Sequence, residues 1–163
     1  MGSDTRRLIV PEPHYTLFNA QREGLPEVIV VNDALLKFPH SDIFPWHLRI
    51  SIDANELADN GMPTNGESKI LFDVGDQIEK VILSSATANN APNAQFLARS
   101  TWNEFRELYF VVHDPEIADK ALQDLLSTRD WPRPWEYHMS EDREWEKAGY
   151  IFQLFTQARK RDA

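Results

Sequence analysis

The stretch Trp46-His47-Leu48-Arg49-Ile50-Ser51-Ile52-Asp53 alternates apolar and polar side chains along its length. Successive side chains of a β-strand point to opposite faces, so a period of two predicts a strand with one face in the core. We expect the core face to carry Leu48, Ile50 and Ile52. The opposite face then carries the polar side chains, which are His47, Arg49, Ser51 and Asp53.

A helix is predicted after this strand. Thr64 and Glu67 have the spacing of a capping box, in which the threonine hydroxyl accepts the amide of residue 67 and the glutamate reaches back to the cap. Gly75 lies inside the helix, at a cost of roughly 1 kcal/mol relative to alanine, and is expected to allow close packing on the sheet. Apolar residues recur at three- and four-residue spacing and form one stripe: Ile70, Leu71, Val74, Ile78, Val81 and Ile82.

A strand pair follows at 94–102 and 105–113, with a tight turn at Asn103-Glu104. Asp114 and Pro115 then mark the start of a second helix, because aspartate favours the N-cap and proline the first helical position. Its buried stripe is predicted to consist of Ile117, Ala118, Ala121, Leu122, Leu125 and Leu126.

A short strand is predicted at 135–139. From residue 46 to residue 139 the order is therefore strand, helix, strand, strand, helix, strand, which is the split βαβ, ferredoxin-like order. The sequence predicts an α+β fold with an antiparallel sheet and two helices on one of its faces.

Two additions flank this unit. Residues 14–20 and 27–36 predict an N-terminal β-hairpin that turns near Gly24 and Pro26. Ser140 is expected to cap a C-terminal helix, with acidic residues in its first turn and Arg159-Lys160-Arg161 in its last. This helix is expected to bury Trp145, Ala148, Phe152 and Phe155. A single domain is predicted over 14–163, preceded by a flexible segment at 1–13.

Composition excludes several classes of function. The chain has 163 residues and a formal net charge of −9, so its surface as a whole repels nucleic acid. It has no cysteine, which rules out disulfides and thiolate chemistry and suits a cytoplasmic location. No apolar run is long enough to cross a bilayer, and we therefore expect no membrane partner.

Three motifs resemble the uncharacterised bacterial domain family DUF 695. They are Phe44 to Ile50, the hairpin from Arg99 to Val111, and Trp135-Glu136-Tyr137 followed by Asp142-Arg143-Glu144-Trp145. The chain departs from the family pattern at the hairpin turn, where glycine is usual and Asn103-Glu104 stands here. The family is similar in element order to the bacterial regulator of ribonuclease activity B, a protein-binding inhibitor. The resemblance implies a fold and favours a binding role, and it implies no catalytic residue.

Catalytic and metal-binding patterns are weak. The five histidines lack the helical HxxxH spacing of a metal site, and the glycines form no phosphate-binding loop. We therefore predict no metal, no cofactor and no catalytic residue. One alternative stays open, an enzyme in which strand-borne side chains converge on the open sheet face: His47, Glu107, Glu136 and His138.

The region from Asp114 to Lys147 is the predicted binding surface. It holds ten acidic and five basic residues, so it would attract a protein partner with a basic surface. Tryptophan concentrates at interfaces because it buries a large area, although the same rings could instead seal the final helix onto the sheet. The hypothesis is a protein-interaction module, a regulator or an immunity-type inhibitor, with these binding residues: Trp131, Trp135, Glu136, His138 and Trp145.

Overall fold

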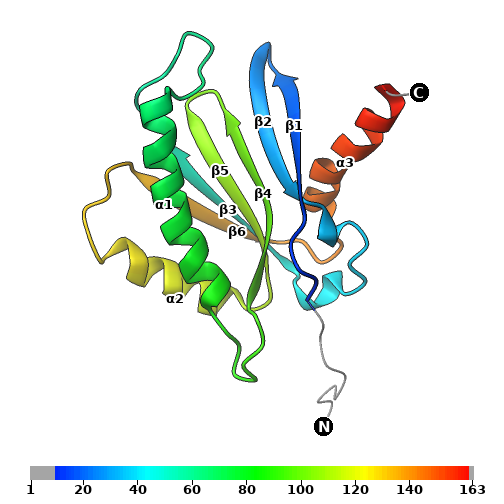
Figure 1. Cartoon of the computed structure of the whole chain (residues 1–163). Coiled ribbons are helices and arrows are strands. Elements are labelled where there is room, and N and C mark those ends of the chain that lie inside the picture. Colours follow the sequence, from blue (N-terminus) through cyan, green and yellow to red (C-terminus); the bar gives the residue numbers. More distant parts are fainter. Residues whose placement is uncertain (1–9, 162–163) are drawn as a thin grey trace.

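The computed structural model describes residues 10–161, and the side chains as far as residue 157. Within that range one six-stranded antiparallel sheet is packed with three α-helices (Figure 1), so the α+β class is confirmed. The strands are β1 Tyr15–Arg22, β2 Leu25–Asn32, β3 Trp46–Asp53, β4 Ala94–Trp102, β5 Phe105–Val112 and β6 Trp135–Glu141. The helices are α1 Asn65–Ser84, α2 Pro115–Leu126 and α3 Glu146–Arg161, and the 3-10 turns are η1 Asp33–Leu35 and η2 Ser41–Ile43.

The strand order is β1-β2-β4-β5-β3-β6. α1 joins β3 to β4 with β5 lying between them, and α2 joins β5 to β6 with β3 lying between them. Each of these two helices therefore crosses over one intervening strand. The N-terminal hairpin pairs through β2 with β4 and extends the sheet on that side.

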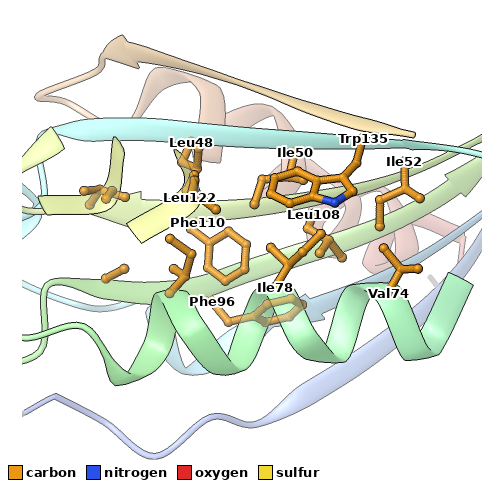
Figure 2. Close-up of a cluster of buried hydrophobic side chains, with 14 of the residues drawn as sticks. Leu48, Ile50, Ile52, Val74, Ile78, Phe96, Leu108, Phe110, Leu122 and Trp135 are labelled. Carbon is orange, nitrogen blue, oxygen red and sulfur yellow. The ribbon is translucent and has the colours of Figure 1, made fainter. Parts of the chain in front are cut away.

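The first core cluster lies between the sheet and the helices α1 and α2 (Figure 2). Leu48, Ile50 and Ile52 are fully buried in it, as their alternation predicts. Gly75 also faces the sheet, and a Cβ there would meet Leu108 at 3.8 Å, which is ordinary contact. Each fully buried large apolar side chain contributes roughly 1.5–3 kcal/mol through removal from water, so this cluster is a principal source of stability.

Both predicted helix starts are confirmed, with one difference. Thr64 Oγ1 accepts the amide of Glu67 at 3.3 Å, and Asp114 accepts the amide of Glu116 at 2.9 Å. The Glu67 side chain does not return to Thr64. It is fully buried and instead accepts hydrogen bonds from the Asn55 amide and from Arg133. A guanidinium is a stronger donor to a buried carboxylate than a backbone amide. This difference accounts for the pairing of Glu67 with Arg133 in place of the Thr64 amide.

The second core cluster lies on the other face of the sheet and holds α3. Trp145 is buried, and its indole Nε1 donates to the carbonyl of Phe44 at 2.8 Å. Ala148 is fully buried, and Phe152 and Phe155 pack against the cluster. The four residues are thus packed as predicted, although Trp145 lies just before the helix, which begins at Glu146. Figure 1 shows α3 beside the β1–β2 hairpin, apart from α1 and α2.

The prediction that Ser140 caps α3 is wrong. β6 pairs with β3 as far as Glu141, so Ser140 lies within a strand and the helix begins at Glu146. The Asp142 carboxylate accepts the amides of Glu146 and Lys147 in place of Ser140. The side chains of Arg159–Arg161 lie outside the described residues. So do residues 1–9 of the predicted flexible segment, while Val10 packs against the second cluster.

The turn between β4 and β5 contains a backbone strain that can be removed. Asn103 and Glu104 have φ values of +39° and +79°, in the left-handed region that glycine adopts most easily. We expect Glu104→Gly to raise the free energy of unfolding by about 1 kcal/mol, because it removes a Cβ from this conformation. Urea denaturation checks the gain. Glu104→Ala is the control, and an equal gain with alanine would assign the effect to loss of the charge.

Candidate functional site

A cleft opens on the face of the sheet opposite α1 and α2, beneath the first turns of α3. Its volume is about 500 Å³. The floor comes from β3, β5 and β6, one wall from α3, and one end from the β1–β2 hairpin. The lining residues are Arg22, His47, Arg49, Glu107, Tyr109, His138, Lys147, Tyr150 and Ile151.

The strand register explains why these side chains meet. β3 is the central strand of the floor, and its outward residues are the polar half of the period-two pattern. Arg49 lies directly between Tyr109 of β5 and His138 of β6. Side chains opposite each other on one face have Cβ atoms roughly 4.5–5.5 Å apart, so Arg49 is within reach of both. Ser51 lies in the same way between Glu107 and Glu136.

His47 forms the deepest polar part of the floor. It is 6% exposed, and its Nδ1 has no hydrogen-bond partner among the described residues. Its ring lies 5.6 Å from the ring of Tyr109. Burial lowers the pKa of His47 to about 4, with further lowering by Lys147, Arg49 and His138 against an opposing effect of Asp142. The imidazole is therefore neutral at neutral pH.

Glu107 and Tyr109 form a hydrogen-bonded pair beside it. The Tyr109 hydroxyl donates to Glu107 Oε2 at 2.7 Å. Burial, and then the charge of Glu107, raises the pKa of Tyr109, so the phenol stays protonated and remains a donor. Glu107 is the only carboxylate among the described residues that line the cleft, and one of its oxygens is thus already occupied.

Three cationic side chains surround this floor. Arg49 and Lys147 are exposed, and Lys147 Nζ donates to the hydroxyl of Ser140. Arg22 closes the end of the cleft, lies 3.4 Å from Glu27 and packs over the Trp102 ring at 4.1 Å. The cleft therefore has a positive lining in a chain whose formal net charge is −9. Such a local reversal attracts anions that the rest of the surface repels.

A second hollow adjoins the cleft. It measures about 250 Å³ and shares Arg49 and His138 with it. Its other lining residues are Ser51, Glu136 and Tyr137. Because the two hollows share residues of neighbouring strands, they form one groove along β3 and β6.

The predicted binding residues fall into two groups. Glu136 and His138 lie in the groove. Trp135 and Trp145 are buried in the two core clusters, and partly buried Trp131 packs edge-on against Trp135 at 5.4 Å. Of these three rings only Trp145 packs with the final helix, as the alternative for them predicted. Trp135 belongs to the first core cluster and Trp131 packs against it, with α1 and α2 on the other face of the sheet.

The residues of the enzyme alternative are brought onto one face. His47, Glu107 and His138 line the main cleft, and Glu136 lines the adjoining hollow. Arg49, Lys147 and Tyr109 were not among the site residues predicted from the sequence. The alternation of β3 could have indicated Arg49, since it shares a face with His47. Lys147 could not be found in this way, because its place depends on where α3 docks.

The structure also bears on metals and membranes. Within residues 10–161, no three side chains of the metal-binding types His, Cys, Asp and Glu lie close enough together to hold an ion. Among the helices that the structure describes, none combines the length and apolar character needed to cross a membrane.

The fold and the groove define an α+β domain with a cation-lined sheet face beneath its C-terminal helix. The sequence profile of a family described as "Family of unknown function (DUF695)" matches residues 14–151, and the chain belongs to this family. The match includes every residue that lines the cleft. Comparison with curated proteins finds no significant match. Comparison with solved structures finds none either.

Proposed function

We propose that this domain is an interaction module that binds an acidic segment of a protein partner in the groove beneath α3. One observation carries the proposal. A chain with a net charge of −9 gathers Arg22, Arg49 and Lys147 around one cavity of about 500 Å³. Complementary charge of this kind steers and orients a partner of opposite sign.

The shape of the groove favours an extended segment over a small molecule. Pockets for small molecules are usually enclosed and mostly apolar. Here Arg49, His138 and Tyr150 are exposed, and two hollows follow each other along the strands. A peptide with successive carboxylates would place one beside Lys147 and Arg49 and leave the next residues to follow β6.

The same groups support binding better than catalysis. Acid–base chemistry needs titratable groups that are positioned by one another and by the substrate. His47 is neutral at neutral pH, and Tyr109 already donates to Glu107. Among the described residues, no hydrogen bond joins His47, Glu107 and His138. The enzyme alternative is supported only by the position of these three side chains in the same cleft.

The partner with a basic surface remains a prediction from the charge count, and the cytoplasmic location remains a prediction from the absence of cysteine. The acidic residues of α2 and of the segment before α3 lie outside the groove lining. An acidic segment in the groove and a basic surface around it can belong to the same partner. Inhibition of that partner is the role that the resemblance in element order suggested.

The test is binding of a short fluorescein-labelled oligoglutamate peptide, followed by anisotropy at low and moderate salt. We expect Arg49→Glu and Lys147→Glu each to weaken binding at least about tenfold, because each replaces a cation of the groove by an anion. Lys69→Glu is the matched control. It is an exposed lysine on α1, on the opposite face of the sheet, and makes the same change in net charge.

Two outcomes would count against the proposal. One is an equal loss of affinity in Lys69→Glu and in the groove variants, which would indicate a general charge effect. The other is a wild-type protein that does not bind oligoglutamate at low salt.

A further inference from the structure

We infer that His47 is a ligand-contacting residue, and that an acidic ligand enters the groove together with a proton on this imidazole. The inference rests on the proposed function and adds that binding is coupled to protonation of His47. His47 lines the cleft and is 6% exposed, and its Nδ1 is buried without a partner among the described residues. A buried polar atom without a partner is unfavourable, and a turn of the ring that brought Nδ1 to a ligand oxygen in the cleft would supply one.

The surroundings of His47 decide its charge. Arg49 lies on its own strand, His138 on β6, Glu107 and Tyr109 on β5, and Asp142 and Lys147 before and within α3. In the free protein, burial and the nearby cations hold the imidazole neutral. Asp142 is the carboxylate that opposes them.

A bound carboxylate changes this balance. Placed between Arg49 and Lys147, it cancels the field of those cations at His47 and offers an acceptor to a protonated ring. An opposite charge within about 4–6 Å raises the pKa of a histidine. Binding and protonation are then linked, and each strengthens the other by the same factor.

The sign of the pH dependence follows. The pKa of His47 is lowered to about 4 in the free protein, and the ligand raises it. Affinity therefore increases as pH falls below the pKa of the complex, and levels off as pH approaches the pKa of the free protein. Above the pKa of the complex, His47 is neutral in both states and pH has no effect through it. Peptide carboxylates take up protons near pH 4.3, so measurements belong above about pH 5.

The experiment follows the His47 ring by NMR on the wild-type protein, with and without oligoglutamate, between about pH 5 and pH 8. We expect the ligand to raise the pKa of His47 by about two units, from about 4 into this window, and the affinity to increase by up to about tenfold per pH unit below the new value. Calorimetry in two buffers of different ionisation enthalpy should show proton uptake on binding.

Two variants test whether His47 is the residue that takes up the proton on binding. His47→Gln should bind with an affinity that no longer depends on pH in this range. His138→Gln should keep the dependence, although His138 is the other histidine that lines the groove.

The outcomes separate the two proposals. Peptide binding with an unchanged His47 resonance and no proton uptake overturns this inference and leaves the proposed function standing. No peptide binding at any pH overturns both. If His47→Gln does not fold, the wild-type NMR titration decides by itself.

Discussion

Replacing Arg133 with alanine is expected to lower the free energy of unfolding by about 3–5 kcal/mol, because it leaves a buried carboxylate without its cation. Glu67 is fully buried at the start of α1. Arg133 Nε lies 2.6 Å from Glu67 Oε2, and Arg133 Nη2 lies 2.5 Å from Oε1. The Asn55 amide donates to Oε2 at 2.7 Å. Through these hydrogen bonds the Glu67 carboxylate links three parts of the chain, which are the segment after β3, the helix α1 and the segment before β6.

Urea denaturation at pH 7 measures the loss. Arg143→Ala is the matched control, because Arg143 pairs with Glu141 while both side chains are largely exposed. Exposed pairs contribute about 0–1 kcal/mol, so this control should unfold close to the wild type. An Arg133→Ala protein that also unfolds like the wild type would show that Glu67 does not depend on Arg133.

The effect should depend on pH in a defined direction. Hydrogen bonds from Arg133, and then from Asn55, lower the pKa of Glu67 from its usual 4.5 to about 2, against the opposing effect of burial. A carboxylate with a lowered folded-state pKa stabilises the fold above about pH 4.5, and this stabilisation is lost as pH falls towards 2. The difference between wild type and Arg133→Ala should therefore shrink from pH 7 to pH 3. A constant difference over this range would contradict the assignment.

Trp145→Ala is expected to cost about 3–5 kcal/mol, which is the range for large-to-small changes at well-packed sites. The Trp145 ring is buried and stacks on Phe38 with 5.8 Å between centroids. Its Nε1 donates a hydrogen bond to the Phe44 carbonyl. A helix of this length is marginal in water by itself, so α3 depends on this packing. The loss would be a large share of a typical domain stability of roughly 5–15 kcal/mol.

Two further variants separate the loss of the buried ring from the loss of its hydrogen bond and from general effects of changing α3. Trp145→Phe keeps most of the apolar ring but leaves the Phe44 carbonyl unpaired, so it should cost less than alanine and still more than about 1 kcal/mol. Gln153→Ala changes an exposed position of α3 and should stay within about 0.5 kcal/mol of the wild type. Wild-type stability in Trp145→Ala would mean that α3 is held by other contacts.

The site was only partly predictable, and the tryptophans show why. Core packing and partner binding both favour large amphipathic rings, so Trp135 and Trp145 fit either role until their burial is known. Both turned out to be core residues. His138 and Glu136, named beside them, do lie in the groove. A strand pattern indicates which residues share a face, and it leaves open what covers that face.

The sequence by itself determined the order of the main strands and helices, the helix caps at Thr64 and Asp114, the α+β class and the core face of β3. These follow from local rules, because side-chain period and capping act over a few residues. The tertiary structure decided the partner of Glu67, the start of α3 and the gathering of cations beneath it. These depend on register and docking between segments far apart in the chain. The net charge of −9 is a sum over the sequence, whereas the field in the groove depends on which charges lie within a few ångströms. For that reason an acidic chain can carry a cationic site that its composition does not indicate.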